Sequence, residues 1–229
     1  MAEISTAIFV FVRFPRPGKV KTRLSQSLGE KKTTWFYRLC ADTILSEIRN
    51  LPENVEKYVF CADKNDEPEI SRWVGPGFSI AIQEGEDLGQ RLKNAFSSVF
   101  NSGMQKVIAV ASDVPDLSTD IMNKSLQTLD NNDIVIGPCY DGGYYLLGMK
   151  RLQNQLFDGI SWSTEHVYRQ TIAAAKKHGL TAGQLQPLMD IDTEEDIYRW
   201  LQITESKQPV FDEFLKTIDR KQMKERLSK

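Results

Sequence analysis

The sequence predicts an α/β protein with a doubly wound, mostly parallel sheet that contains one antiparallel strand. Short apolar runs alternate with amphipathic stretches through about residue 137, which is typical of repeated βαβ units. One run, Val107 to Ala111, is apolar at every position, as in a strand that is buried on both faces. The extended run after Gly142 and Gly143 follows too closely for a helical crossover, so that strand should be antiparallel to its neighbour.

Composition limits the organisation and the partners. The chain has 229 residues, 41% hydrophobic and 26% charged, with a net charge of −2, which argues against a nucleic-acid or anionic-membrane partner. The longest apolar run near the start, residues 7–12, is too short to span a membrane. Three widely spaced cysteines without a C-x-x-C pair fit a reducing cytoplasm. We expect residues 1–205 to form one domain and residues 206–229 to extend it as an amphipathic helix, and association into a homo-oligomer stays open.

The first half of the chain predicts alternating strands and helices. The strands are expected at Ile4–Val12, Val55–Cys61 and Phe78–Ile82. The basic, proline-containing segment 13–23 is typical of a loop. Apolar residues at helical spacing predict a helix over Leu28–Asn50, which Pro52 ends, and a second helix follows Asp87 as its N-cap.

The second half continues the pattern with shorter elements. The extended segments expected after the central strand are Asp133–Gly137, Tyr144–Leu147 and Gln184–Leu188. Helices are expected to begin at Ser118 or Thr119, at Ser163 or Thr164 (ending at Lys177), and after Thr193, which forms an approximate capping box with Asp196. Residues 209–228 predict one more amphipathic helix.

The loop after the first strand, residues 13–23, contains five cations and no acidic residue, and three of the cations lie near the expected helix start: Lys19, Lys21 and Arg23. Cations and backbone N–H groups at a strand-to-helix turn favour phosphate binding. Neither G-x-G-x-x-G nor a Walker loop is present, so the usual dinucleotide and ATPase loops are excluded. The alternative interpretation is a solvated basic loop.

Aspartates follow the central strand and precede a late helix. Asp113 comes where Pro115 stops the strand, and ligands of open α/β sheets bind beyond the carboxyl ends of strands. One or two carboxylates with substrate phosphates form a set that Mg²⁺ prefers. Asp190 and Asp192 have an alternative explanation as helix-capping residues, worth about 1 kcal/mol. We expect Asp113 and Asp192 to meet across the crevice, opposite the cationic loop.

A reversal is predicted at Asp141-Gly142-Gly143-Tyr144. Two glycines permit backbone conformations that are closed to other residues and a close approach to a ligand. The segment must at least introduce the antiparallel strand. Whether Asp141 and Tyr144 also line a pocket stays open.

Four segments occur together and in order: Gly18–Leu24, Ser112–Leu117, Gly137–Gly148 and Asp190–Asp196. In these segments the chain resembles the DUF2064 family of GT-A-fold transferases, often called selenodomain-associated or arsenosugar-type glycosyltransferases. These are relatives of the phospholactate and molybdopterin guanylyltransferases. The resemblance runs from about residue 5 to 205 and implies a nucleotide-diphospho-sugar transferase (GT-A, Rossmann-like) fold, with a nucleotide over the first strand ends.

The resemblance also implies roles for individual residues. Those that would face phosphates are Lys19, Lys21 and Arg23. Those that would hold Mg²⁺ or Mn²⁺ are Asp113 and Asp192. A family element near the nucleotide or second substrate is matched by Asp87, Leu88, Gly89 and Arg91. The acceptor pocket would be bordered by Asp141, Gly142, Gly143 and Tyr144.

The sequence supports two enzymatic hypotheses and one non-enzymatic hypothesis. The favoured one is glycosyl transfer from a nucleotide-diphospho-sugar to a small-molecule acceptor, with Asp116 or Asp141 as the base for the acceptor hydroxyl. The alternative is nucleotidyl transfer, in which a substrate phosphate attacks a nucleoside triphosphate and pyrophosphate is released. The separated aspartates favour the alternative, whereas the family resemblance favours glycosyl transfer. A nucleotide-binding regulatory module would bind without turnover.

Overall fold

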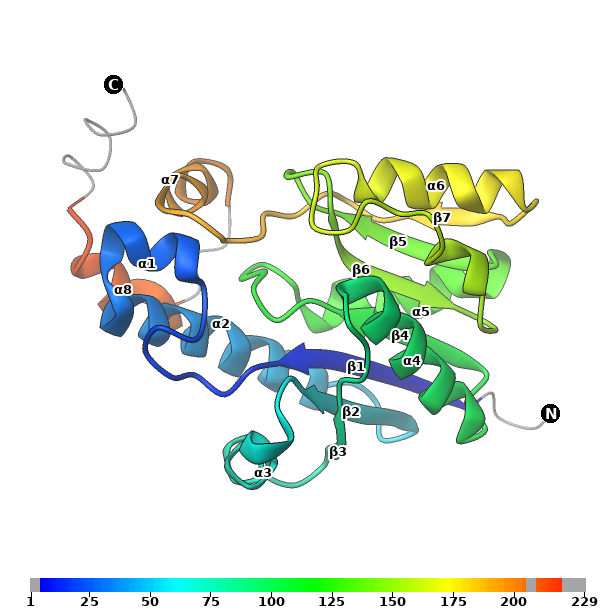
Figure 1. Cartoon of the computed structure of the whole chain (residues 1–229), viewed down its shortest axis with the longest axis horizontal. Helices are drawn as coiled ribbons and strands as arrows, with labels where there is room; N and C mark the ends of the chain where they lie inside the picture. Colours follow the sequence, from blue (N-terminus) through cyan, green and yellow to red (C-terminus); the bar gives the residue numbers. More distant parts are fainter. Residues whose placement is uncertain (1–4, 205–208, 220–229) are drawn as a thin grey trace.

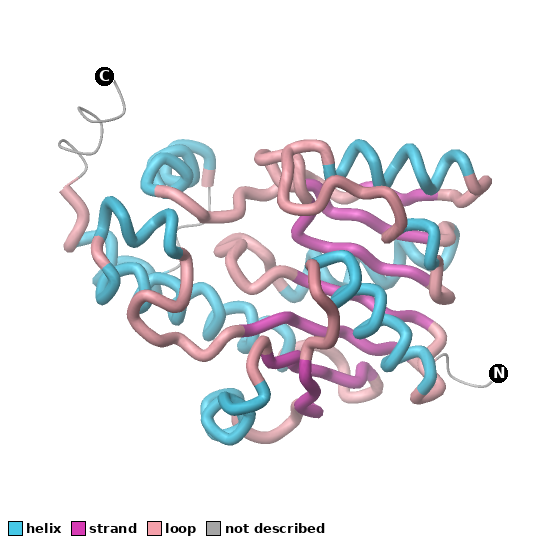
Figure 2. Tube along the Cα trace, in the orientation of Figure 1, coloured by secondary structure: helices cyan, strands magenta, loops and turns pink. Residues whose placement is uncertain are grey.

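The computed structural model describes residues 5–204 and 209–219. Its centre is a seven-stranded sheet with the order β3-β2-β1-β4-β6-β5-β7 (Figures 1 and 2). The strands are β1 Thr6–Val12, β2 Val55–Cys61, β3 Ser79–Ile82, β4 Lys106–Val110, β5 Ile134–Pro138, β6 Tyr144–Met149 and β7 Ala182–Gln184. Only β6 runs antiparallel to its neighbours in this sheet, pairing with β4 and β5. The predicted fold class is confirmed.

Helices cover both faces of the sheet. Side chains of α4 (Leu88–Asn101) and α6 (Val167–Lys177) pack on one face. Those of α2 (Glu30–Arg49), α3 (Glu67–Val74) and α5 (Thr119–Asn131) pack on the other. Figure 1 shows α4 in front of the sheet and α5 behind it. Every residue of β4 is buried, which explains why its sequence is an unbroken apolar run.

A smaller apolar cluster lies beyond the carboxyl end of β1, on the left of Figure 1. It joins α1 (Thr22–Leu28), the first half of α2, α7 (Glu194–Ile203) and α8 (Asp212–Lys216). Its largest buried side chains are Phe36, Trp200, Phe211 and Phe214. Three short 3₁₀ turns complete the described elements: Lys64–Asp66, Asn154–Leu156 and Pro209–Phe211. No helix of the described ranges is both long and apolar enough to cross a membrane.

The local signals in the sequence located three helix starts correctly. Asp87, Ser118 and Thr193 are N-caps whose side chains accept backbone hydrogen bonds, and Thr193 forms the predicted capping box with Asp196. These assignments succeeded because a cap depends on residues only three positions apart.

Three predicted helices have different limits. The helix expected over Leu28–Asn50 begins only at Glu30, because Leu28 ends the separate helix α1 and Gly29, with a φ of 76°, lies between the two helices. The helix expected from Ser163 or Thr164 begins only at Val167, because Ser163 has a φ of 61° and cannot enter a right-handed helix. The helix expected over 209–228 ends at Lys216 within the described residues, and residues 220–228 lie outside them.

Substitution of Asp133 by asparagine should lower stability at neutral pH more than in acid. The backbone N–H and hydroxyl of Thr181 each donate to Oδ2 of Asp133 at 2.8 Å, which links the start of β7 to β5 and lowers the pKa of Asp133. A carboxyl with a lowered pKa stabilises the fold above its unfolded value of about 4, and this contribution disappears as the pH falls through the folded value. Because the pair is open to solvent, we expect a difference below about 1 kcal/mol.

Urea unfolding of both proteins at about pH 7 and about pH 3 measures this difference. A difference that is equally large at both pH values would contradict the prediction.

Candidate functional site

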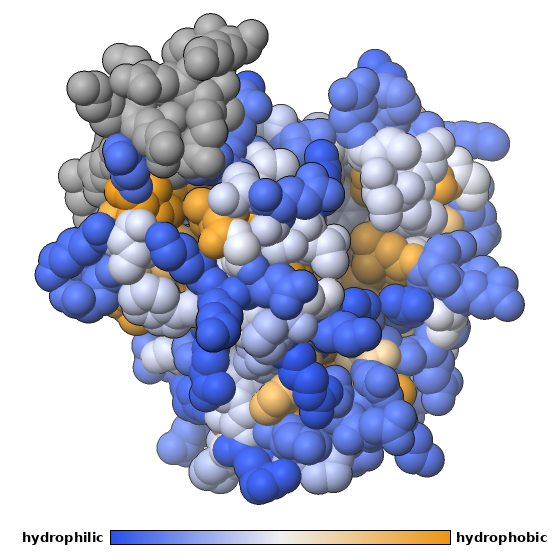
Figure 3. All heavy atoms as spheres, turned by 60° about the vertical axis from the view of Figure 1, so that its left-hand side comes forward, coloured by the Kyte–Doolittle hydropathy of each residue, from blue (hydrophilic) through white to orange (hydrophobic). Residues whose placement is uncertain are grey.

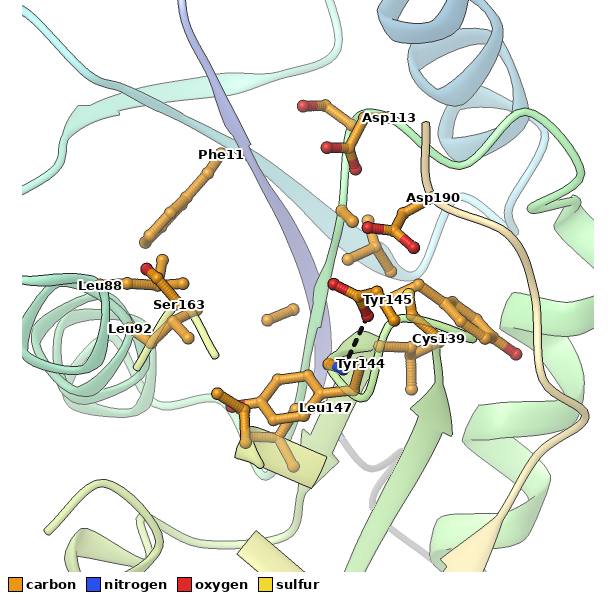
Figure 4. A pocket seen from close by; sticks show the side chains of 18 of the residues that line it. Phe11, Leu88, Leu92, Asp113, Cys139, Tyr144, Tyr145, Leu147, Ser163 and Asp190 are labelled. Atoms are coloured by element: carbon orange, nitrogen blue, oxygen red, sulfur yellow. Dashed lines mark hydrogen bonds between the residues drawn. The ribbon is translucent and has the colours of Figure 1, made fainter. Parts of the chain in front are cut away.

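A cleft of about 890 Å³ opens beside the carboxyl ends of β1 and β4, on the face of the sheet that α4 covers. Its lining has two parts, which Figure 4 shows on opposite sides of β1. One part carries carboxylates, including Asp113 and Asp190, and the other carries apolar side chains, including Phe11 and Leu92. In Figure 3, hydrophobic groups are visible in a recess among hydrophilic ones on the side turned forward.

The polar part is organised around Lys21. Its Nζ lies 2.5 Å from Oδ2 of Asp113 and 2.6 Å from Oδ1 of Asp192, and its side chain is only 8% exposed. Arg23 approaches the second oxygen of Asp192, with Nη1 at 3.6 Å from Oδ2. The predicted meeting of Asp113 and Asp192 at the cationic loop is therefore confirmed as geometry.

Local structure places these three side chains. Lys21 is the N-cap of α1 and has a left-handed backbone (φ 45°, ψ 51°), which is uncommon for a residue with a side chain. The Asp113 carbonyl accepts a hydrogen bond of 3.1 Å from the backbone N–H of Ile191, so the two acidic segments run together. The capping box of α7 fixes the next residues, since Oδ2 of Asp196 accepts from the backbone N–H groups of Asp192 and Thr193.

The electrostatics follow from this arrangement. Burial lowers the pKa of Lys21, but Asp113 and Asp192 outweigh that effect and hold the pKa above its usual range. Burial raises the pKa of Asp192, but Lys21 and Arg23 bring it below its usual range. Lys21 is therefore a charged ammonium and Asp192 a carboxylate at neutral pH.

Asp190 belongs to a second acidic group in the cleft. Side-chain donor atoms of Cys139, Asp141 and Asp190 all lie within 4.8 Å of one another. Burial, with the nearby charges of Asp141 and Asp113, raises the pKa of Asp190 to about 7. Burial also raises the pKa of the Cys139 thiol, and the neighbouring aspartates raise it further. This cysteine stays protonated, so it is a weak metal ligand.

The donor set of the cleft fits a hard divalent cation. The available ligand atoms are carboxylate oxygens of Asp113, Asp141, Asp190 and Asp192, which suit Mg²⁺ or Mn²⁺ better than softer metals. Lys21 contacts one oxygen of Asp113 and one of Asp192. A carboxylate has about four lone-pair sites, so each can also contact a cation.

The apolar part of the cleft is formed by distant elements. Its side chains are Phe9 and Phe11 of β1, Leu88 and Leu92 of α4, Tyr144 and Leu147 of β6, and Trp162. Trp162 belongs to the loop after Gly159, which forms one wall together with Ser163, Thr164 and Glu165.

Two glycines allow this wall to approach. A Cβ at Gly89 would lie 2.0 Å from Nε1 of Trp162, and a Cβ at Gly142 would lie 2.1 Å from the carbonyl oxygen of Glu165. Gly142 also has a φ of 91°, which favours glycine. These glycines therefore determine where the wall stands relative to α4 and the 141–143 turn.

The remaining predicted residues divide into those in the cleft and those beside it. Asp141, Gly143 and Tyr144 line it, and Oδ1 of Asp141 accepts from the backbone N–H of Gly143 at 2.7 Å. Asp87, Gly89 and Arg91 are not lining residues. Asp87 caps α4, Gly89 contacts Trp162, and Nε of Arg91 donates to the carbonyl of Gly85. Lys19 is exposed, and its carbonyl accepts from Arg13.

Asp116 lies outside this cleft and holds α7 in place. Its carboxylate accepts from Nε1 of Trp200 at 2.8 Å and from the hydroxyl of Thr204 at 3.0 Å. Burial raises its pKa, although these two bonds act in the opposite direction. Of the two carboxylates that the sequence offered as a base, only Asp141 reaches the cleft.

The sequence interpretation did not assign functions to several lining residues. These residues, which the sequence suggested only as core or loop residues, are Cys139, Phe11, Leu92 and Trp162. A weak signal in the sequence was Trp162, three residues after Gly159. A glycine turn there begins the loop that carries the tryptophan into the wall of the cleft.

The fold and the cleft together define the class of the protein: it has the fold of the nucleotide-diphospho-sugar transferases. Residues 48–164 match the family described as "Uncharacterized protein conserved in bacteria (DUF2064)". The chain belongs to this family. Among curated proteins, none matches the chain significantly.

Solved structures agree with this class. A "putative nucleotide-diphospho-sugar transferase" from Desulfovibrio desulfuricans G20 is 30% identical, with 99% of this chain and 96% of that chain covered and a TM-score of 0.83. A cytidylyltransferase from Leptospira borgpetersenii is 16% identical (99% and 94% covered, TM-score 0.53). Rv0371c from Mycobacterium tuberculosis, in complex with manganese, is 13% identical (87% and 100% covered, TM-score 0.52). The last two show similarity of fold alone.

Replacing Asp116 by alanine should reduce stability, because Asp116 anchors α7 and does not itself reach the cleft. The change removes the carboxylate to which the indole N–H of Trp200 and the hydroxyl of Thr204 donate, a loss of about 1–3 kcal/mol. Chemical unfolding measures this loss, and Asp116→Asn is the control, because its amide oxygen keeps one acceptor. Loss of nucleotide binding at unchanged stability would instead place Asp116 in the functional site.

Proposed function

We propose that the protein is a metal-dependent transferase that moves a glycosyl group from a nucleotide-diphospho-sugar to a small acceptor. The observation that carries this proposal is the convergence of Asp113, Asp192 and the cationic loop at Lys21, beyond the carboxyl ends of β1 and β4. Ligands of open α/β sheets bind at this position. The resemblance to the Desulfovibrio desulfuricans protein, which is described as a "putative nucleotide-diphospho-sugar transferase", supports the same class of donor.

The cationic loop is suited to the diphosphate of the donor. Arg23 is 72% exposed and lines the cleft, so its guanidinium is accessible to a phosphate, which it can bind through two parallel hydrogen bonds. Lys21 supplies a second charge at the inner end of the loop, and Lys19 a third on the exposed side. The loop therefore binds and orients the leaving group.

Asp113 and Asp192 are the residues that would hold the metal, with Asp190 and Asp141 nearby. When bound, a divalent ion supplies charge neutralisation for the departing diphosphate. The structure that contains manganese belongs to a protein that shares the fold with this chain, so it is a precedent for a divalent metal in this fold and no more.

The acceptor would lie between the 141–143 turn and the wall at Trp162. In the transfer, the bond between the anomeric carbon and the diphosphate oxygen breaks, and a bond from the acceptor oxygen to that carbon forms. Asp141 is the group that would take the proton of the acceptor hydroxyl, because it is exposed in the cleft and fixed by Gly143. Gly142 and Gly143 hold the turn beside it.

Nucleotidyl transfer is the second candidate, and one observation favours it. The carboxylates that meet at Lys21 come from two segments far apart in the chain, whereas glycosyltransferases of this fold class usually place a D-x-D at one strand end. A carboxylate base beside the acceptor pocket favours glycosyl transfer instead, because a phosphate nucleophile needs no such base. Products separate the two reactions: a nucleoside diphosphate for glycosyl transfer, and pyrophosphate for nucleotidyl transfer.

A thermal-shift panel of nucleotides and nucleotide sugars with Mg²⁺ or Mn²⁺ tests the proposal. A ligand at a hundred times its dissociation constant should stabilise the fold by about 2.7 kcal/mol. The best ligand is then incubated with the enzyme and candidate acceptors, and the released products are identified. If no nucleotide or nucleotide sugar stabilises the protein, both transferase proposals fail.

Asp113→Asn should remove the metal-dependent part of nucleotide binding. The substitution removes one carboxylate charge from the pair at Lys21 while it keeps the shape of the side chain. In calorimetric titrations, Mg²⁺ or Mn²⁺ should raise the nucleotide affinity of the unmodified protein but not that of the variant. Asp130→Asn, at a partly buried ion pair with Lys106 outside the cleft, is the matched control. If the metal raises the nucleotide affinity of the variant as much as that of the unmodified protein, Asp113 does not belong to the metal site.

Arg23→Ala should weaken the binding of a nucleoside diphosphate much more than the binding of the corresponding nucleoside. The lost charge-assisted bonds to phosphate are worth about 1.5–3 kcal/mol, which corresponds to a loss of roughly 10- to 150-fold. Arg72→Ala is the control, since Arg72 is an exposed arginine on α3 that does not line the cleft. Equal effects on nucleoside and diphosphate would count against phosphate binding at Arg23.

A further inference from the structure

The ammonium group of Lys21 occupies the space between the two carboxylates to which the proposed function assigns the metal. Its Nζ lies within 2.6 Å of an oxygen of each, Asp113 on one side and Asp192 on the other. Among the described residues, no other cation has an ion pair with both carboxylates. Arg23 reaches only Asp192, and at a longer distance of 3.6 Å.

The position of Lys21 is fixed by the backbone as well as by charge. Its φ of 45° turns the chain at the start of α1 into the left-handed region, which few residues other than glycine, asparagine and aspartate adopt. The side chain is 8% exposed, whereas those of Asp113 and Asp192 are 28% and 41% exposed. The lysine therefore lies beneath the carboxylates, which remain open to the cleft.

We propose that Lys21 is an internal counter-cation that competes with the divalent metal for Asp113 and Asp192. The inference rests on the proposed function, because it assumes that these aspartates hold the metal. With Lys21 in place, its positive charge compensates one of the two negative charges and its Nζ contacts both carboxylates, so a metal ion that arrives alone gains less. A metal ion that arrives with the donor brings phosphate oxygens, and the Lys21 ammonium can turn to them as its bonds to the carboxylates weaken.

Two consequences follow from this competition. Free metal should bind weakly to the unmodified protein, and metal and phosphate should strengthen each other's binding. Removal of the lysine charge should leave Asp113 and Asp192 uncompensated, which favours a divalent cation between them. Lys21 would thus act as a positioning residue that makes metal binding depend on the donor.

The test is a calorimetric titration of the full-length protein with Mn²⁺ alone, in the unmodified form and as Lys21→Met. Methionine keeps the length of the side chain and removes its charge. We expect the variant to bind Mn²⁺ at least about tenfold more tightly, which corresponds to about 1.4 kcal/mol. The matched control is Lys124→Met, which removes an exposed lysine of α5 outside the cleft and should leave Mn²⁺ affinity unchanged.

A second titration of the unmodified protein uses Mn²⁺ in the presence of inorganic pyrophosphate. Affinity for Mn²⁺ should rise with pyrophosphate in the unmodified protein and change less in Lys21→Met. If the variant is unfolded without metal, recovery of folding is tested by thermal unfolding at increasing concentrations of Mn²⁺. Parallel samples contain NaCl at equal ionic strength as the control. Recovery with Mn²⁺ alone supports the exchange, and no recovery with either salt overturns it.

Equal Mn²⁺ affinity in the unmodified protein and in Lys21→Met would overturn the inference, as would an equal or larger gain in Lys124→Met. Such a result would leave the transferase proposal intact, because no nucleotide is present in the first titration. Conversely, a nucleotide panel without any stabilising ligand would remove the transferase proposal whatever the Mn²⁺ affinities are.

Discussion

The ion pairs of Lys21 with Asp113 and Asp192 are the interaction on which the polar part of the cleft depends. A buried ammonium without partners is costly, and two neighbouring carboxylates without a cation repel each other. Each of the three charges is therefore stable at its position only because the other two are present. The pairs join the loop after β1, the end of β4 and the segment before α7, which are far apart in the sequence.

This arrangement needs support from elements that carry no functional group. α7 must hold Asp192 at the edge of the sheet, and it is fixed there by its capping box, by the packing of Trp200 and by the hydrogen bonds of Asp116. Asp116 and Asp113 are neighbours in sequence with different functions: one anchors the helix and the other faces the cleft. The apolar cluster of α1, α7 and α8 thus keeps the loop of Lys21 and the segment of Asp192 in contact.

The fold and part of the site could be predicted because their signals are local or periodic. The all-apolar run of β4, the N-caps at Asp87 and Thr193, and the antiparallel β6 after two glycines each depend on a few adjacent residues. The sequence could not show which of Lys19 and Lys21 contacts the two aspartates. Both lysines lie in the same loop, and the left-handed backbone of Lys21 is a feature that only the structure reveals. Likewise, nothing near Asp116 in the sequence reveals that its carboxylate accepts a hydrogen bond from Trp200, 84 positions away.

The two parts of the cleft are held by different physical means, and this has a consequence for specificity. The polar part depends on charges that any phosphate-bearing donor would engage. The apolar part depends on how closely Trp162 and Glu165 approach Gly89 and Gly142, where any larger side chain would push the wall outward. Changes at these glycines would alter the shape available to the other substrate while the ion pairs at Lys21 stay intact. Under the proposed function, substitutions at these glycines would change the choice of acceptor without changing the contacts to the donor.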